Sequence, residues 1–301
     1  MKDFLRCADI VVVPLLGLTS EPSMNTRRTL LAGLASATAS AIFPSWASAQ
    51  NTAFDHSHAA WTTLLKKHLV VQRAGQASQM RYAGMAADRS ATKAYLGTLS
   101  ALSAATFESF SKPQQMAFLI NAYNAYTVEL ILTRYPKLDS IKDIGSVFQS
   151  PWKPKFIKLL GTDMSLDNIE HDTLRARGRF DDPRVHFAVN CASIGCPALR
   201  EEAFTADRLE VQLEEQASRF MSDRSRNRWS AQGETLEVSK IFDWFGEDFR
   251  LGHKGISSLN AFFARYADKL ADTPAERERI KGGQTKVAFL DYDWKLNDAK
   301  A

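Results

Sequence analysis

The sequence predicts an α+β fold, in which a single, mostly helical domain packs around a small sheet. Segments with a helical spacing of apolar residues outnumber strand-like segments by roughly two to one, and the two kinds do not strictly alternate. No low-complexity linker interrupts residues 55–297, and no internal repeat occurs. The composition, 45% hydrophobic and 24% charged over 301 residues, is that of an ordinary globular protein with a sizeable core.

An export signal is predicted before this domain, in residues 1–49. Arg27 and Arg28 precede a weakly hydrophobic, alanine-rich stretch that ends in SWASA, the small residues that a signal peptidase requires. Paired arginines in this setting are typical of a twin-arginine signal. We therefore expect translation to begin at Met24 and the mature protein to be periplasmic or secreted. Residues 1–23 are interpreted as an upstream extension; the alternative is that their apolar residues 10–18 form a membrane-proximal tail.

The mature domain, residues 50–301, is expected to be soluble and to bind no nucleic acid. After residue 49, no stretch approaches the roughly 18 to 20 apolar residues that a membrane-spanning helix needs. The formal net charge of the chain is only +4, and its basic residues are spread among acidic ones. No electrostatic footprint for nucleic acid is present, and the arginine-rich residues 219–228 are interpreted as a solvated helix end.

Three helices are predicted in the first half of the domain. Residues 59–72 and residues 86–102 each have apolar side chains at helical spacing. Pro113 opens the third and strongest helix, which Pro136 ends. This central helix is apolar almost all round, as expected of a helix that neighbours bury on every side.

Two asparagines interrupt the apolar surface of the central helix. Asn121 and Asn124 are three residues apart, so they project to nearly the same side. Leaving either amide unpaired in the interior would cost roughly 1 to 3 kcal/mol, so both must have partners. Two interpretations follow: the amides tie down neighbouring loops, or they line a ligand pocket.

A hairpin and a polar helix come next. Residues 155–164 contain a Gly-Thr-Asp turn between apolar residues, which is typical of a hairpin. The following helix is predicted over residues 166–177. On it His171 and Arg175 share a face, whereas Glu170 points about 100 degrees away.

Five further elements are predicted from the same patterns. All five follow residue 200. They are an amphipathic helix over residues 206–221, a strand over 234–238, an aromatic helix over 239–249, a helix over 256–270 and a strand over 286–294.

Residues 184–200 (RVHFAVNCASIGCPALR), here named the cysteine segment, hold the most distinctive chemistry. They contain two of the three cysteines and one of the six histidines. Alternating apolar residues predict a strand over 184–189, so Cys191 lies where the strand gives way to a turn of small residues. A side chain there can be both fixed and reachable. The alternative is an inert, buried thiol.

Cys191 needs a base or a positive neighbour to become a reactive thiolate. His186 is five positions away, roughly 16 Å along a strand, so its ring does not meet the thiol. His171 lies on a separate helix and can pack against the cysteine turn, with a neighbour such as Glu170 orienting its imidazole. The main-chain N–H groups of residues 192–195 would then be oxyanion donors.

Two other interpretations of the cysteine segment remain open. The residues between Cys191 and Cys196 can turn so that the two Cα atoms lie within about 4.4 to 6.8 Å, the range of a disulfide. Such a bond would stabilise the fold by about 2 kcal/mol and silence the thiol. A metal site from His171, His186, Cys191 and an acid lacks any short ligand spacing, so no metal and no cofactor are expected.

Five motifs follow one another along the domain: FLINAYNAYTVELIL, SLDNIEHDTLR, RVHFAVNCASIGCPALR, VSKIFDWFGEDF and YDWKLN. In order and character the sequence resembles the domain of unknown function 547 family, which occurs in exported bacterial proteins and in plant proteins. The resemblance covers residues 60–297. None of the motifs names a reaction or a substrate.

The resemblance implies a set of family positions in this chain. They are Asn121, Asn124, Glu170, His171, Arg175, His186, Cys191, Ser193 and Pro197. In plant members the counterpart of Cys196 is not a cysteine, which implies a role for Cys191 itself. The coiled-coil segment of many plant relatives has no counterpart here, so partner binding through a zipper is not implied.

Two functions agree with these residues. The first is a thiol-dependent hydrolase or acyl transferase acting on an amide or ester in a small molecule or peptide, with Cys191 as nucleophile, His171 as general base and Glu170 as its orienter. The residues predicted to bind its substrate are Asn121, Asn124, Arg175, His186 and Ser193. The alternative is a non-catalytic binding domain of the cell envelope, in which Cys191 and Cys196 form a structural disulfide.

Overall fold

The structure is a computed structural model that describes residues 53–146 and 149–300. They belong to one compact unit that spans residues 52–301. The predicted export signal and upstream extension lie outside the described residues. Within the described ranges, no helix has both the length and the apolar character needed to cross a membrane.

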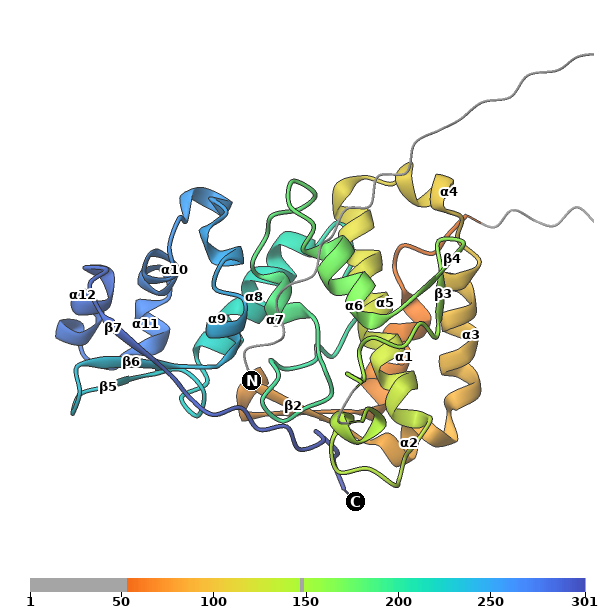
Figure 1. Cartoon of the computed structure of the whole chain (residues 1–301), viewed down its shortest axis with the longest axis horizontal. Helices are drawn as coiled ribbons and strands as arrows, with labels where there is room; N and C mark the ends of the chain where they lie inside the picture. The colour runs from red at the N-terminus through yellow and green to blue at the C-terminus, as the bar shows by residue number, and fades with distance from the viewer. Residues whose placement is uncertain (1–52, 147–148, 301) are drawn as a thin grey trace, which may run out of the picture. The chain divides into compact units, whose positions relative to one another are not determined.

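The chain is mostly helical with small sheets, so the α+β class is confirmed (Figure 1). The expectation of one sheet is wrong, because the described strands form three separate sheets. Two of these are antiparallel hairpins, and in the third a strand near the end of the chain adds in parallel. The strands pair as β1 Leu69–Gln72 with β2 Ala77–Met80, β3 Ile157–Leu159 with β4 Thr162–Met164, and β5 Arg228–Ser230 with β6 Thr235–Val238 and β7 Lys286–Phe289.

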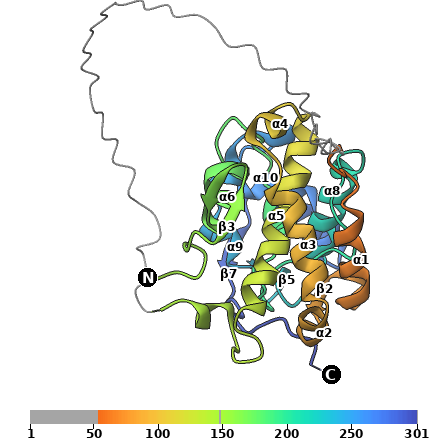
Figure 2. The same ribbon diagram turned by 90° about the vertical axis from the view of Figure 1, so that its right-hand side faces the viewer.

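Helix α5, Lys112–Leu132, is the centre of the first core, a cluster of buried apolar residues that includes Trp61 and Phe118. A capping box of Ser111 and Gln114 starts the helix, and its later side chains are buried almost all round. Figure 2 shows α3 alongside α5, with α1 beyond α3. The helices around α5 are α1 Ala59–His68, α2 Tyr82–Ala87, α3 Arg89–Ser100 and α4 Ala104–Glu108.

The first predicted helix extends too far at its C-terminal end. It stops at His68, and the four residues of β1 that follow were assigned to it wrongly. Two of them, Val70 and Val71, are β-branched and favour a strand. Pairing of Leu69 with Met80 places both side chains in the first core, so tertiary packing overrides the helical spacing.

The hairpin predicted over residues 155–164 is confirmed as β3 and β4, but Thr162 and Asp163 of the predicted Gly-Thr-Asp turn lie in β4. Leu160 and Gly161 connect the strands, with φ values of 53° and 77°. A two-residue turn of this left-handed kind matches the twist of paired strands.

The polar helix predicted over residues 166–177 is present but changes its winding. Ser165 caps α6, Leu166–Ile169, and the chain continues as a π-helical turn over Glu170–Leu174. Glu170 is buried, whereas His171 is half-buried.

Residues 184–189 form a helical turn, so the predicted strand is wrong. The Val189 N–H donates to the Val185 carbonyl at 3.1 Å and closes α7, Val185–Ala188. All residues of α7 are buried: Phe187 packs in a second core, Val185 and Ala188 pack in the first, and His186 bonds to Asp248. Burial on every side produces an apolar run whose periodicity does not distinguish helix from strand.

The second core is rich in phenylalanine and is built mainly after residue 216. Phe187 lies 5.2 Å from Phe220, and Phe249 lies 4.8 Å from Phe262, between ring centroids. The predicted helices over 239–249 and 256–270 are each broken into shorter pieces. The helices of this region are α8 Leu209–Met221, α9 Ile241–Trp244, the 3₁₀ turns Asp248–Arg250 and His253–Gly255, α10 Leu259–Arg265, α11 Ala267–Leu270 and α12 Pro274–Lys281. Two further 3₁₀ turns, Arg73–Gly75 and Ile141–Ile144, lie earlier in the chain.

Candidate functional site

The asparagines of α5 tie down two loops. Asn124 donates to the Ala188 carbonyl at 2.9 Å and accepts from the Asn190 N–H at 2.8 Å. In the same way, Asn121 donates to the Phe204 carbonyl at 2.8 Å and accepts from the Phe204 N–H at 3.0 Å. Both amides are buried, so these bonds replace those that water would make. A role for them in substrate binding stays a prediction.

Cys191 and Cys196 form a disulfide across the loop of the cysteine segment, with their Cα atoms 6.3 Å apart. Cys191 is half-buried, and Cys196 is buried. The Cys196 sulfur accepts from the Tyr292 hydroxyl at 3.1 Å and from the Cys191 N–H at 3.0 Å. The Cys191 sulfur lies 3.3 Å from the Tyr292 hydroxyl and 3.7 Å from the Ser193 hydroxyl.

The end of the chain holds Tyr292 over this loop. The Ile194 N–H donates to the Lys295 carbonyl at 2.9 Å, and the Gly195 N–H donates to the Asp293 carbonyl at 2.8 Å. A side chain on residue 195 would place its Cβ 2.9 Å from the Tyr292 ring. Glycine is therefore needed at this position so that the ring can lie against the loop.

Glu170 lies near two buried tyrosine hydroxyls, those of Tyr123 and Tyr292, and the second of these contacts the disulfide. Burial raises the pKa of Tyr123, and the Glu170 carboxylate, which hydrogen-bonds to its hydroxyl, raises it further. Burial also raises the pKa of Tyr292; the Arg226 guanidinium opposes that rise and Glu170 adds to it. Both hydroxyls therefore keep their protons at neutral pH, and Glu170 lies within electrostatic reach of each.

A charged cluster, defined as His171, Arg175, His186 and Asp248, adjoins the start of the cysteine segment. The Asp248 carboxylate accepts from Arg175 Nε at 2.6 Å and binds His186 Nε2 at 2.7 Å. Arg175 also binds His171 Nδ1. The Phe245 ring stacks on His186 with centroids 4.2 Å apart and lies 4.6 Å from the Arg175 guanidinium.

Burial and hydrogen bonding set the charges in this cluster. Burial lowers the pKa of His186, although the bond to Asp248 partly offsets the effect. Burial works against ionisation of Asp248, but hydrogen bonds from His186 and Arg175 outweigh it and hold the pKa of Asp248 well below its usual range. Asp248 and Arg175 therefore form an ion pair, to which the neutral His186 adds a hydrogen bond.

The predicted nucleophile and base have different partners. His171 binds Arg175 and lies 3.7 Å from Asp167, whereas the Cys191 sulfur has the contacts given above. Within residues 53–146 and 149–300, no hydrogen bond joins the two side chains, and no three His, Cys, Asp or Glu residues are placed to hold a metal. The catalytic roles of Cys191, His171 and Glu170 stay predictions.

Three residues of the site were missed in the sequence. Asp248 and Phe245 lie in the VSKIFDWFGEDF motif, and Tyr292 lies in YDWKLN. A carboxylate among aromatic residues was a usable signal for Asp248. Its partner His186 is 62 positions away, and Tyr292 is 101 positions from Cys191, so no local pattern linked them.

Four adjoining rings, of which Tyr292 contacts the disulfide through its hydroxyl, form what we name the aromatic surface: Trp152, Trp244, Tyr292 and Trp294. The Trp294 centroid lies 4.5 Å from Tyr292, 5.5 Å from Trp244 and 5.8 Å from Trp152. Trp244 is 37% exposed, and the other three are half-buried. The Lys142 ammonium lies 3.7 Å from the Trp294 centroid.

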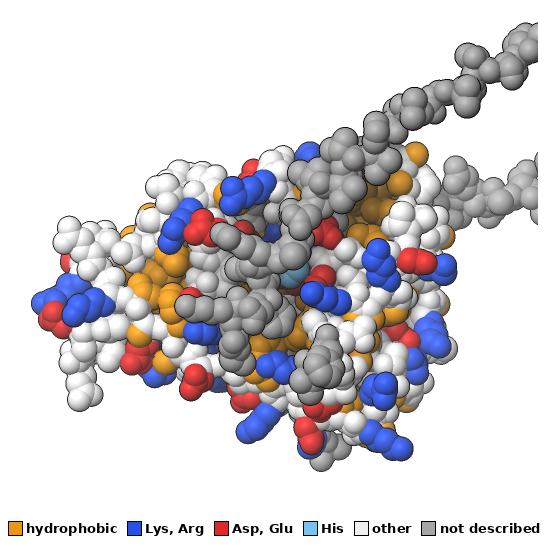
Figure 3. Space-filling model, in the orientation of Figure 1, with side chains coloured by type: hydrophobic (Ala, Val, Ile, Leu, Met, Phe, Trp, Pro, Cys, Tyr) orange, Lys and Arg blue, Asp and Glu red, His pale blue; other side chains and the backbone are white. Residues whose placement is uncertain are grey.

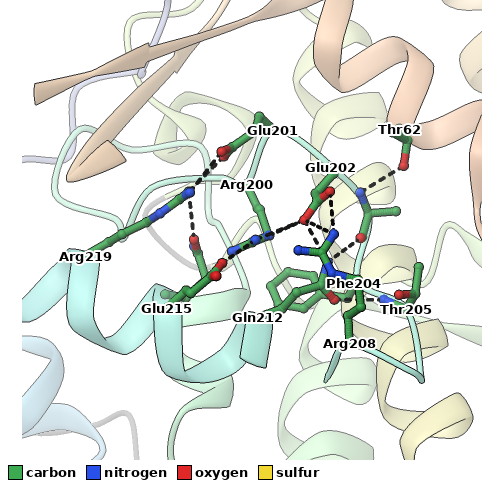
Figure 4. A network of polar contacts seen from close by, with 12 residues as sticks. Thr62, Arg200, Glu201, Glu202, Phe204, Thr205, Arg208, Gln212, Glu215 and Arg219 are labelled. Atoms are coloured by element: carbon green, nitrogen blue, oxygen red, sulfur yellow. Dashed lines mark hydrogen bonds and ion pairs between the residues drawn. The ribbon is translucent and has the colours of Figure 1, made fainter. Parts of the chain in front are cut away.

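A separate pocket of about 500 Å³ adjoins the end of the cysteine segment. Glu202 in its wall accepts from Arg200, Arg208 and Gln212 (Figure 4). Thr62 lines the same pocket, and its hydroxyl accepts a hydrogen bond from the Ala203 N–H. None of the residues predicted for catalysis or substrate binding lines this pocket.

One family matches the chain, and it does so over residues 107–221, with the description "Protein of unknown function, DUF547". The match runs from α4 to the end of α8 and includes the cysteine segment, but it ends before Asp248 and Tyr292. Neither curated proteins nor solved structures gave a match. The resemblance stated from the motifs is confirmed: the chain carries a DUF547 domain over residues 107–221.

Proposed function

We propose that this protein is an exported binding domain whose aromatic surface holds a neutral oligosaccharide. The observation that carries the proposal is the set of adjoining rings around Trp294, of which Trp244 is 37% exposed. Exposed apolar clusters with a polar rim mark binding surfaces, and aromatic rings supply large contact areas at small entropic cost.

The charges around the rings favour a neutral ligand rich in hydroxyl groups. Lys142, Asp293 and Lys295 are exposed at or beside the aromatic surface, so both signs are present. Figure 3 shows basic and acidic side chains interspersed over the face of the molecule that it draws. A mixed field selects neither anions nor cations. A sugar ring offers C–H groups to the aromatic faces and hydroxyls to the charged side chains.

The disulfide supports binding rather than thiol hydrolysis. It engages the Cys191 sulfur, which a hydrolase would need as a thiolate. It also closes the loop against which Tyr292 lies. A ring fixed before the ligand arrives loses less conformational entropy on binding.

We place this function in the periplasm or outside the cell. The signal-like residues 24–49 support this location, and so does the disulfide, because such bonds persist in oxidising compartments. Fractionation of expressing cells tests it: the mature chain should begin near Gln50 outside the cytoplasm. Replacing Arg27 and Arg28 with lysines should retain the protein inside, and unchanged export of that variant would contradict a twin-arginine route.

Affinity electrophoresis of the full chain through gels that contain neutral polysaccharides tests the ligand class. The expected result is retardation by at least one polysaccharide, weakened by about 1 to 3 kcal/mol in Trp244→Ala. Phe156→Ala is the matched control, because Phe156 is also 37% exposed but lies outside the aromatic surface. No retardation in any gel, or equal weakening in both variants, would overturn the proposal.

A further inference from the structure

We propose that the Cys191–Cys196 disulfide is a thiol–disulfide exchange site, at which an external dithiol attacks the Cys191 sulfur and Cys196 leaves as a stabilised thiolate. This activity goes beyond ligand binding at the aromatic surface. The two sulfurs differ in access and in hydrogen bonding, and both differences favour attack in this one direction.

Access favours Cys191 as the attacked sulfur. Cys191 is half-buried, whereas Cys196 is only 5% exposed. Ile194, in the loop between them, is 40% exposed, so the disulfide loop lies at the surface. Because exchange needs a direct approach to the sulfur under attack, an incoming thiolate reaches Cys191 more readily.

Hydrogen bonding favours Cys196 as the leaving group. Its sulfur accepts from the Cys191 N–H at 3.0 Å, a donor that the Cys191 sulfur does not share, and from the Tyr292 hydroxyl at 3.1 Å, which lies slightly farther, at 3.3 Å, from the Cys191 sulfur. Burial raises the pKa of Tyr292, so this hydroxyl remains a donor. Hydrogen bonds to a thiolate stabilise it, and a better-stabilised thiolate leaves faster.

A buried cation adds to this preference. The Arg226 guanidinium donates to the Cys196 carbonyl and to the Gln76 carbonyl, the latter at 2.6 Å. Its side chain is 11% exposed and pairs with Asp223, which offsets part of its charge. The guanidinium is thus fixed to the residue on which negative charge develops.

The exchange balances without any further reactant. One thiolate of the dithiol forms a bond to the Cys191 sulfur, and the Cys191–Cys196 bond breaks with its electron pair on Cys196. The second thiol of the dithiol then attacks the mixed disulfide and releases Cys191. The dithiol is oxidised to a disulfide, and the protein gains two electrons and two protons.

A redox titration of the full chain tests the role of the tyrosine. The protein is equilibrated with buffers of reduced and oxidised dithiothreitol, alkylated, and read at the Cys191 and Cys196 peptides by mass spectrometry. Tyr292→Phe keeps the ring but removes the donor, so its equilibrium constant for reduction should fall about tenfold or more. Tyr266→Phe removes another buried tyrosine hydroxyl, one bound to Glu214, and should titrate as wild type does. Equal titration of wild type and Tyr292→Phe would overturn the proposal.

Single-cysteine variants test the direction of attack, and they do so even if Tyr292→Phe fails to fold. In Cys196→Ser, glutathione disulfide should form a mixed disulfide at Cys191. The same reaction at Cys196 in Cys191→Ser should be slower by about tenfold or more, because that sulfur is buried. Faster reaction at Cys196, or a wild-type disulfide that dithiothreitol reduces only after denaturation, would overturn the proposal. Neither outcome concerns sugar binding, so the two proposals fail separately.

Discussion

The two halves of the cysteine segment are held by different chemistry. The helical half, residues 184–188, is held by the ion pairs of Arg184 and by the bond between His186 and Asp248. The loop half, residues 189–197, is held by neutral amide bonds to the main chain, by the disulfide and by the Arg226 guanidinium, which donates to the Cys196 carbonyl and does not titrate with acid. The comparison teaches that one continuous segment can respond to acid at one end and to reductant at the other.

The largest expected effect is the loss of the carboxylate that holds the helical half. Asp248→Asn leaves Arg175 without its ionic partner, and the two side chains are only 16% and 18% exposed. The free energy of unfolding should therefore fall by about 3 kcal/mol. Denaturant titration measures this loss. The matched control Asp243→Asn removes an exposed carboxylate paired with Lys240 and should change stability by at most about 0.5 kcal/mol; equal losses would break the comparison.

Removal of the Asn124 side-chain amide, which holds the loop half, should lower the stability of the protein. Asn124→Ala leaves the Ala188 carbonyl and the Asn190 N–H without a partner in the interior. We expect the free energy of unfolding to fall by about 2 kcal/mol, independently of pH between 5 and 8. Asn260→Ala, which removes one bond from a half-buried amide to Gly283, should cost less. A loss in Asn124→Ala that grows with acidity would contradict a neutral attachment.

Reduction of the disulfide should lower the free energy of unfolding by about as much as Asn124→Ala does, or slightly less. Because the loop closed by Cys191 and Cys196 is short, the disulfide contributes about 2 kcal/mol on the chain-entropy model. The double variant Cys191→Ser, Cys196→Ser should lose that amount in urea titrations. Dithiothreitol should then have no further effect on the variant. Continued destabilisation of the variant by dithiothreitol would show that the disulfide is not the reducible group.

The last effect, which is the smallest near neutral pH and grows in acid, is the difference in acid response. Burial lowers the pKa of His186, so below about pH 6.5 the unfolded chain binds a proton that the folded chain does not. The lowered pKa of Asp248 acts in the same direction below about pH 4. Stability should therefore fall as pH falls through both ranges.

Denaturant titrations of wild type and Asp248→Asn at several pH values measure this response. The stability advantage of wild type should shrink by up to about 1.4 kcal/mol per pH unit below pH 4. His58 in the first core, whose pKa burial lowers to about 4, affects both proteins alike and cancels. A constant advantage across that range would show that the carboxylate is not held as an ion.

Elements with strong local patterns could be predicted from the sequence. The α5 helix has its capping box and proline, α8 has an apolar stripe, and the β3–β4 hairpin has its turn residues. Each of these signals lies within a few residues of the structure that it specifies. The turn α7 and the strand β1 could not be predicted, because burial by distant elements decides their conformation.

The site divides in the same way. Motifs in the sequence marked Glu170, His171, Arg175, His186 and Cys191 as site residues, and each of them has polar partners in the structure. Two of these partners, Asp248 and Tyr292, come from segments 62 or more positions away. Residue spacing carries no information about contacts between such distant segments, because only the folded chain brings them together.

The most direct measurement is a count of free thiols in the native full chain. Labelling with iodoacetamide, followed by mass spectrometry of the peptides that contain Cys191 and Cys196, reads the two positions separately from Cys7. The disulfide-bonded binding domain predicts no label at either position until a dithiol is added. A single reactive thiol at Cys191, labelled well below the usual pKa of about 8.5, would contradict it and favour the thiol hydrolase.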